Sequence, residues 1–342
     1  MAGEFDFIRW VLQQTATPRA DRERPSFIVV PPGDDLAALD LSVGTAELQR
    51  GEGRTARDLL LVGIDQVLEG RHFDRAVHAP ELIGRKAMNR NLSDCAAMGC
   101  LPAAAVVSVS LPIGWGLENA QRLYRGLREA ADRHYCAVVG GDTGSWHGPL
   151  AVSVAVLGRT LGVEPVTRGG AAPGDGIYVT GPLGGSLLGR HLTFEPRIAL
   201  GRQLATYRPT GLPCVHAMID ISDGLLRDLG HLLAPSPLHG PLGAELQSAA
   251  VPIHDDARLL AARTGRPPLA HALTDGEDHE LLFTCPVRPP VGIRIGTVVA
   301  EPGIRIDGVP ASQFPELAGS PAVNGQPASP GVQVSPGWEH PL

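Results

Sequence analysis

The chain has 342 residues, 43% of them hydrophobic and 19% charged, and a formal net charge of -7. Its length favours two domains with full cores, and its negative charge argues against a nucleic-acid or anionic-membrane partner. No apolar run reaches the roughly 18 residues that cross a bilayer, so we expect no membrane-spanning helix.

The N-terminal half alternates short apolar runs with amphipathic patterns. Residues 4–14 have the spacing of an amphipathic helix, and their acids differ from the basic start of a signal peptide, which favours a cytoplasmic protein. The periodicity predicts helices over 81–98 and 117–134 and strands over 27–30, 36–39, 59–64, 103–111, 136–139 and 150–157. Residues 42–57 interrupt this pattern as a polar insertion, and the first domain is predicted to span residues 1–159.

The second half is predicted to form a domain over residues 160–342. The predicted elements are a turn-rich entry at 168–175, a glycine-rich loop at 181–189 running into a helix, a strand within 217–224 that breaks into a leucine-rich helix, and an acid turn at 274–280 followed by a strand. From about residue 319 to 342 the chain is rich in Pro, Gly, Ser and Val and is expected to run as an extended tail. Strands and helices alternate in both halves, so the fold class is α/β or α+β.

The five cysteines are odd in number and form no CxxC pair. This pattern is typical of free thiols that pack in the core of a protein from a reducing compartment. A zinc site or a disulfide framework is not expected.

The predicted helix over 81–98 carries more polar groups than a surface helix needs. Lys86 is the only lysine of the chain, while every other cationic side chain is an arginine, which indicates a need for a compact ammonium. Asn91 and Asp94 are three residues apart and therefore share a face of the helix. Taken alone, the segment is more often a core helix that has one solvated face.

Carboxylates recur beside glycines, at predicted strand ends and helix starts, where ligand sites of layered folds form. The candidates are Asp34, Asp35, Asp65, Asp94, Asp142, Asp220, Asp223, Glu277 and Asp278. Singly, each has an ordinary explanation, such as a turn at 34–35, a hairpin at 140–143 or a helix cap at 220–223. Together, hard oxygen donors without paired His or Cys ligands favour Mg²⁺ on a polyphosphate, and hence phosphoryl transfer. The P-loop and protein-kinase motifs are absent from the sequence.

Seven motifs run in order along most of the chain. They are GDD at 33–35, D-x-x-x-EG-x-HF at 65–73, IGRKAMNRNLSDCAAMG at 83–99, GGDT at 140–143, TRGGAAPGD at 167–175, DISDGLLRDLGH at 220–231 and GEDHELLFT at 276–284. With these motifs the chain resembles the thiamine-monophosphate kinases of the aminoimidazole ribonucleotide synthetase-like superfamily. The resemblance implies a two-domain fold, a homodimer built through the N-terminal sheet, and ATP-dependent phosphorylation of thiamine monophosphate to thiamine diphosphate. It further implies direct in-line transfer with several Mg²⁺ ions.

The resemblance also assigns roles to single residues. It implies metal ligation by Asp35, Asp65, Asp94, Asp142, Asp220 and Asp223, with Asp94, Asp142, Asp223 and Lys86 in catalysis. The nucleotide contacts that it implies are Gly141, Asp142, Arg168 and Ser222, and the substrate contacts are His72, Glu277 and Trp338. Trp338 would offer an aromatic face to the thiamine rings, although a tail residue covering apolar surface is an equal alternative. His72 alone is more often a packed or surface histidine.

Three departures from the pattern of the family involve four positions. Gly63 and Ile64 stand where hydroxyl residues usually precede the aspartate of the second motif, so a restored hydroxyl at 64 is expected to improve Mg²⁺ affinity or rate. Asp275 replaces a glycine and His279 replaces a common tyrosine, which leaves substrate identity open. Two alternatives therefore stay open: a related ATP-dependent enzyme with another acceptor, and a non-catalytic nucleotide-binding homologue.

Overall fold

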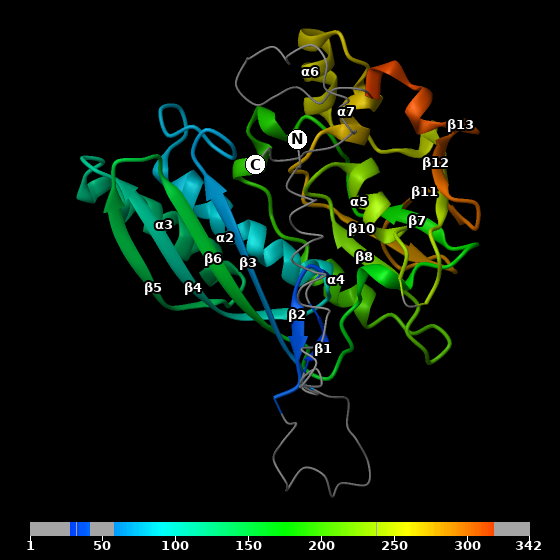
Figure 1. Ribbon diagram of the computed structural model, residues 1–342, viewed down its shortest axis with the longest axis horizontal. Helices are drawn as coiled ribbons and strands as arrows, with labels where there is room; N and C mark the ends of the chain where they lie inside the picture. The colour runs from blue at the N-terminus through cyan, green and yellow to red at the C-terminus, as the bar shows by residue number, and fades with distance from the viewer. Residues whose placement is uncertain (1–27, 32, 42–57, 237, 318–342) are drawn as a thin grey trace, which may run out of the picture.

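The computed structural model describes residues 28–31, 33–41, 58–236 and 238–317, which form two sheets with their helices (Figure 1). The predictions for residues 4–14, for the insertion at 42–57, for the tail from 319 and for Trp338 lie outside the described residues. Within the described ranges, no helix has the length and apolarity that a membrane crossing requires.

The first sheet has six strands in the order β1-β2-β3-β6-β4-β5. Their bounds are Ile28–Val30 for β1, Ala37–Leu39 for β2, Leu60–Leu68 for β3, Leu101–Pro112 for β4, Ala137–Trp146 for β5 and Ala151–Arg159 for β6. Neighbouring strands are antiparallel except β4 and β5, which are parallel. In β6, Val152, Val154 and Val156 are buried and alternate with less buried residues, as a strand with one covered face requires.

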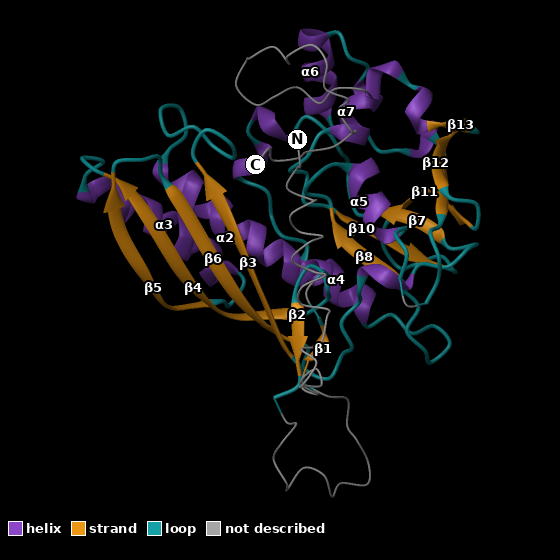
Figure 2. Cartoon of the chain, in the orientation of Figure 1, coloured by secondary structure: helices purple, strands orange, loops and turns teal. Residues whose placement is uncertain are grey.

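Helices α2 (Pro80–Ala97) and α3 (Leu117–Arg133) pack against each other beside the first sheet (Figure 2). In α3 the buried residues Leu123, Leu127 and Ala130 recur at helical spacing and form one apolar stripe. The observed bounds of both helices lie within one residue of the predicted ones. They agree because an apolar stripe marks directly which residues face the sheet.

The second sheet has seven strands in the order β13-β12-β9-β11-β7-β10-β8. Their bounds are Gly176–Val179 for β7, Ala217–Asp220 for β8, Gly243–Leu246 for β9, Leu281–Cys285 for β10, Ile293–Val299 for β11, Gly303–Ile306 for β12 and Val309–Pro310 for β13. The accompanying helices are α4 (Ile198–Ala205), α5 (Leu225–Leu232), α6 (Asp255–Thr264) and α7 (Pro268–Thr274). The mixed sheets with their helices confirm the predicted α/β (α+β) class; the boundary at residue 159 stays a prediction.

Helix α2 is the element that joins the two sheets. It contacts α3, β3 and β6 of the N-terminal half, and also α4 and β8 of the C-terminal half. A helix enclosed on several sides buries polar residues as well as apolar ones, and here Lys86, Asn89, Asn91 and Ser93 are buried. Buried polar groups require partners, so this helix must contribute to a polar site between the halves. The five cysteines lie in the same hydrophobic core and serve as packing residues.

Three local predictions were wrong. Asp65 lies inside β3 instead of ending it, because β6 pairs with β3 as far as Leu68. The strand predicted over 136–139 extends through Trp146, and the hairpin left open at 140–143 does not form, since these residues pair in parallel with β4. The loop at 181–189 leads into two short 3-10 turns, and α4 begins only at Ile198, because Gly185 and Gly189 have positive φ angles of 73° and 136°.

The close crossing of α2 and α3 requires a glycine at position 126. A Cβ atom at this position would overlap the carbonyl oxygen of Glu81 in α2, and a backbone atom cannot turn aside as the end of a flexible side chain can. We expect Gly126→Ala to lower the free energy of unfolding by about 1–3 kcal/mol, measured by urea denaturation. Gly230 of α5 is a matched helical control, since a Cβ there meets open space. Gly230→Ala should stabilise the protein by up to about 1 kcal/mol, and equal effects of the two substitutions would contradict the tight crossing.

Candidate active site

Three carboxylates from distant parts of the chain meet beside α2. Asp35 lies in the turn between β1 and β2, Asp94 lies near the end of α2, and Asp220 is the last residue of β8. One oxygen from each lies within 4.8 Å of the others. Three hard oxygen donors without nitrogen or sulfur ligands are the donor set that Mg²⁺ prefers, so these residues fit a magnesium site.

The electrostatics of this three-carboxylate cluster favour a bound cation. Burial raises the pKa of Asp35 to about 7, although Arg168 opposes the shift. Burial, with the charges of Asp65, Asp220 and Asp35, raises the pKa of Asp94 well above its usual range. A divalent cation would remove the repulsion that causes part of these shifts, and would release protons as it binds.

Asp220 is held in its ionised form by two neighbours. Ser93 Oγ donates to Asp220 Oδ2 at 2.6 Å, and His279 Nδ1 lies 3.0 Å from the same oxygen. Burial by itself would raise the pKa of Asp220, but the hydrogen bond and charge of His279, with Ser93, lower it overall. The cluster therefore combines one stabilised carboxylate with two that gain from a cation.

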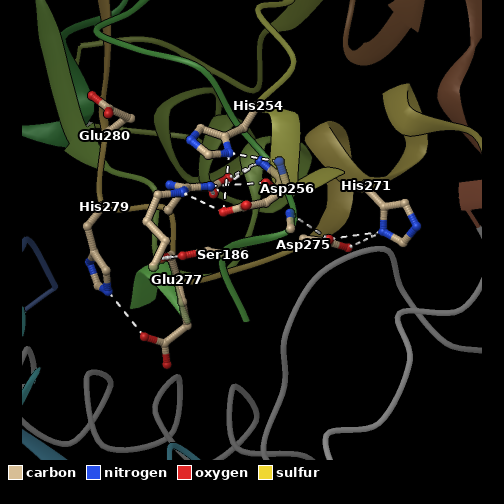
Figure 3. Close-up of polar contacts among 12 residues, drawn as sticks. Ser186, His254, Asp256, His271, Asp275, Glu277, His279 and Glu280 are labelled. Atoms are coloured by element: carbon tan, nitrogen blue, oxygen red, sulfur yellow. Dashed lines mark hydrogen bonds and ion pairs between the residues drawn. The ribbon is translucent and has the colours of Figure 1, made fainter. Parts of the chain in front are cut away.

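His279 bridges the cluster to Glu277. Its Nε2 atom lies 3.2 Å from Glu277 Oε2, a contact that Figure 3 shows, and its ring stacks on Phe194 with centroids 4.0 Å apart. Burial tends to lower the pKa of His279, but the hydrogen bonds to Asp220 and Glu277 raise it overall. With a carboxylate at each ring nitrogen, the imidazole donates twice and fixes both acids.

Lys86 is the second partner of Glu277. The two charged groups lie 3.0 Å apart, and the lysine side chain is 0% exposed. Its ammonium also donates to the carbonyl oxygen of His72 at 2.8 Å and to His191 Nδ1 at 2.7 Å. Burial lowers the pKa of Lys86 to about 8, and Glu277 opposes the shift. Three acceptors around one ammonium explain why this position is a lysine.

The acid turn before β10 is buried, and its charges are paired. Asp278 accepts from Arg190 Nη2 at 2.9 Å and from the Gly184 N–H at 2.8 Å. Asp275 lies 3.0 Å from His271 Nδ1 and accepts from the Gly185 N–H at 3.0 Å (Figure 3). The carboxylate of Asp275 thus points toward α7 and the glycine loop, which accommodates the charge that departs from the family pattern.

Arg168 binds the acidic turn after β1. Its Nη2 atom donates to Asp35 Oδ1 at 2.6 Å, and its backbone N–H donates to Asp34 Oδ2 at 3.0 Å. The structure therefore brings Arg168, predicted to contact the nucleotide, directly against a carboxylate of the cluster.

Several predicted site residues lie elsewhere. Asp142 and Gly141 are exposed on β5 and fall outside every carboxylate group found among the described residues. Gly141 has a structural requirement, because a Cβ there would overlap the carbonyl oxygen of Val107 in β4. Asp223 belongs to a second group with Asp228 and His231.

Two further predicted residues shape loops around the site. His72 is 5% exposed, and its Nδ1 accepts from the Leu68 N–H at 3.0 Å, which closes the turn after β3. The carbonyl oxygen of Ser222 accepts from the Glu277 N–H at 2.7 Å. His72 thus positions the turn whose carbonyl oxygen accepts from Lys86, and Ser222 positions the backbone of Glu277.

The residues before Asp65 explain one departure from the family pattern. A Cβ at Gly63 would overlap Leu36 Cδ2, so glycine makes room for the residue next to Asp35. Ile64 is 69% exposed and projects from the opposite face of β3 to Asp65, because strand side chains alternate. A hydroxyl at position 64 would not face the same side as Asp65, so the geometry gives no support to the expected gain in Mg²⁺ affinity.

Arg90 and Ser93 were missed by the sequence analysis. Arg90 Nε donates to Asp65 Oδ2 at 3.0 Å and its Nη1 donates to Glu277 Oε1 at 3.1 Å. The available signal was the spacing of four residues from Lys86 to Arg90 and from Arg90 to Asp94, which places all three on one face of the helix.

Comparisons with known proteins identify relatives of this chain. Residues 33–160 match the family model described as "AIR synthase related protein, N-terminal domain". The thiamine-monophosphate kinase of Rhodopirellula baltica is 42% identical over 251 residues, covering 73% of this chain and 74% of the relative. That of Mycobacterium tuberculosis is 34% identical and covers 84% of each chain. A solved structure described as AaThiL complexed with AMPPCP and TMP superposes with a TM-score of 0.74 at 27% identity, covering 99% of this chain and 97% of that chain.

Proposed function

We propose that this chain, which belongs to the thiamine-monophosphate kinase family, uses its three-carboxylate cluster to transfer a phosphoryl group from ATP to thiamine monophosphate. The family relationship expected from the motifs is confirmed by relatives of this identity and coverage. ATP is the co-substrate and thiamine monophosphate the acceptor, so the product is thiamine diphosphate. The convergence of Asp35, Asp94 and Asp220 is the observation that carries the assignment to this site.

The residues of the cluster have complementary roles in this proposal. Asp35, Asp94 and Asp220 would hold Mg²⁺, which when bound neutralises charge on the phosphates during direct in-line transfer. Arg168 donates to Asp35. When a nucleotide phosphate competes with Asp35 for the guanidinium, Arg168 supplies a fixed positive charge to that phosphate. Ser93 and His279 orient Asp220, and Lys86 holds Glu277 at the acceptor side.

The remaining site assignments stay predictions. Asp65, Asp142 and Asp223 are proposed metal ligands, Asp142 and Asp223 also act in catalysis, and Gly141 and Ser222 are proposed nucleotide contacts. His72 and Trp338 are proposed substrate contacts.

A homodimer through the first sheet is part of the proposal, with a cytoplasmic location. Strand β5 is an edge strand whose residues are exposed along nearly its whole length. Exposed apolar side chains lie on the same sheet, namely Ile64, Val106, Val139 and Trp146. An open edge with apolar surface supports association with a second copy of the chain.

Product formation is the direct test of this function. Purified protein with Mg²⁺, ATP and thiamine monophosphate should form thiamine diphosphate, detected by chromatography, and no product should form from thiamine. ATP binding without product would favour another acceptor. Absence of both would favour a non-catalytic homologue and contradict the proposal.

A further inference from the structure

The acid turn before β10 holds two residues in a strained backbone conformation. Glu277 and His279 have φ angles of 65° and 52°, in the left-handed region that residues other than glycine rarely adopt. Their backbone N–H groups donate to the carbonyl oxygens of Ser222 at 2.7 Å and Ile221 at 2.8 Å. A strained conformation persists only where the surrounding structure fixes it. The contacts that fix this turn therefore also fix the side chains of Glu277 and His279.

The ring of His279 has contacts at both nitrogen atoms and on one face. Nδ1 lies 3.0 Å from Asp220 Oδ2, and Nε2 lies 3.2 Å from Glu277 Oε2 (Figure 3). The ring of Phe194 stacks on it, with centroids 4.0 Å apart and an angle of 14° between the planes. The two hydrogen bonds fix the positions of the nitrogens, and the stacked ring opposes a tilt about the line that joins them.

Phe194 is itself fixed between the two halves of the chain. Its side chain is buried, and its carbonyl oxygen accepts from Asn89 Nδ2 of α2 at 2.6 Å. Four residues earlier, Arg190 donates to Asp278 of the acid turn at 2.9 Å. The segment that carries Phe194 thus binds both α2 and the acid turn, so the phenyl ring has a defined position relative to each of them.

Asp220 depends on His279 more than Glu277 does. Glu277 has two cationic partners besides His279, at 3.0 Å and 3.1 Å. Asp220 accepts from Ser93 Oγ at 2.6 Å, and it does so through Oδ2, the same oxygen that His279 contacts. Neither of these two partners contacts Oδ1, which leaves that oxygen for a cation at the cluster. Movement of the imidazole would therefore displace the carboxylate of Asp220 more than that of Glu277.

We propose that Phe194 is a positioning residue for the phosphoryl transfer: by stacking on His279 it holds that ring against Asp220 and keeps the carboxylate aligned for the cation. The phenyl ring carries no charge and acts through the orientation of the imidazole. The inference rests on the proposed function and deepens it, because it names a residue outside the cluster on which cation binding depends.

The test compares the wild type with Phe194→Leu, which removes the aromatic face and keeps an apolar side chain. Mn²⁺ is the probe, titrated by electron paramagnetic resonance with the ATP analogue AMPPCP. We expect Phe194→Leu to weaken Mn²⁺ binding about tenfold, as the loss of an outer partner of a metal ligand does. The half-saturating Mg²⁺ concentration for product formation should rise by a similar factor. The KM for thiamine monophosphate should change by less than about twofold, because Glu277 keeps its two cationic partners.

A double-mutant cycle separates positioning from a general structural role. His279→Gln alone should weaken Mn²⁺ binding at least about tenfold, and adding Phe194→Leu to it should have less than about a twofold further effect. Phe283→Leu is the matched control, because Phe283 is buried and stacks on Tyr178 in the second sheet, with centroids 5.3 Å apart. It should lower the melting temperature and leave the Mn²⁺ affinity within about twofold of the wild type.

Nuclear magnetic resonance of ¹⁵N-labelled histidine gives a readout that requires neither cation nor turnover. The ring N–H signals of His279, assigned by their loss in His279→Gln, should exchange with solvent at least about tenfold faster in Phe194→Leu. Unchanged Mn²⁺ affinity in folded Phe194→Leu, or equal effects of this substitution in both backgrounds, would overturn the inference. Wild-type Mn²⁺ affinity in His279→Gln would overturn it even if Phe194→Leu does not fold.

Failure of the proposed function would be distinct from failure of this inference. A wild type that forms no thiamine diphosphate, or that binds no Mn²⁺ with AMPPCP, would contradict the proposed function. The exchange rates of the His279 ring N–H groups would then still show whether Phe194 holds the imidazole. Normal product formation together with unchanged exchange rates in Phe194→Leu would contradict the role of Phe194 alone.

Discussion

Replacing Asp94 by asparagine is expected to lower the rate of thiamine diphosphate formation by about a thousandfold or more, equivalent to about 4 kcal/mol of transition-state stabilisation. Asp94 is the carboxylate that α2 contributes to the three-carboxylate cluster, and asparagine keeps its shape but loses its charge. A metal held by one fewer anionic ligand neutralises less of the charge on the phosphates. Steady-state kinetics over a range of Mg²⁺ concentrations would measure the loss.

The same substitution should leave the fold intact or slightly more stable. Burial and the charges of Asp65, Asp220 and Asp35 raise the pKa of Asp94, so its ionised form is unfavourable in the folded protein without a cation. Without metal, we expect the melting temperature of Asp94→Asn to lie between that of the wild type and a value about 2–4 °C higher. Activity is then lost for a chemical reason and not through unfolding.

Asp132→Asn is the matched control for Asp94→Asn. Asp132 lies in α3 and pairs with Arg128 on the surface at 3.3 Å, where both side chains are more than 60% exposed. Its substitution should change neither rate nor melting temperature measurably. Near-wild-type activity of Asp94→Asn would remove the cluster from the mechanism.

Replacing Lys86 by methionine is expected to lower the free energy of unfolding by about 3–5 kcal/mol. The substitution removes the buried donor to the His72 carbonyl oxygen and to His191, and it removes one cation from Glu277. Methionine has a similar length and leaves little cavity. The loss of unfolding free energy therefore measures mainly the missing polar contacts. Urea denaturation would measure it, and unchanged stability would mean that these contacts contribute little.

Arginine at position 86 separates charge from shape. Because the Lys86 side chain is fully buried, the larger guanidinium has no space, and we expect Lys86→Arg to lose about 1–3 kcal/mol and to impair activity. Arg85→Lys is a control on the same helix, since Arg85 pairs with Glu195 outside the site. Wild-type activity of Lys86→Arg would show that the compact ammonium is not required.

Much of the fold was determined by local sequence patterns. The 3.6-residue spacing of Leu123, Leu127 and Ala130 predicted α3, and the short apolar run at 150–157 predicted β6, because each pattern reports which segments face a core. The sequence motifs indicated the family, and they include Asp35, Asp94 and Asp220, the three carboxylates that meet in the cluster. The single lysine stands at a buried position.

Which residues become neighbours in the site was decided only by the tertiary structure. Asp35, Asp94 and Asp220 are separated by 59 and 126 residues in sequence, and nothing in their local patterns distinguishes them from Asp142, which lies exposed on β5. Arg90 gains its role from contacts with β3 and with a turn 187 residues away. Backbone periodicity is a short-range property, whereas the convergence of charges depends on how α2 packs between two sheets. The sequence by itself therefore determined the elements, the family and the candidate acids, and the packing of α2 decided which acids meet one another and which of them pair with a cationic side chain.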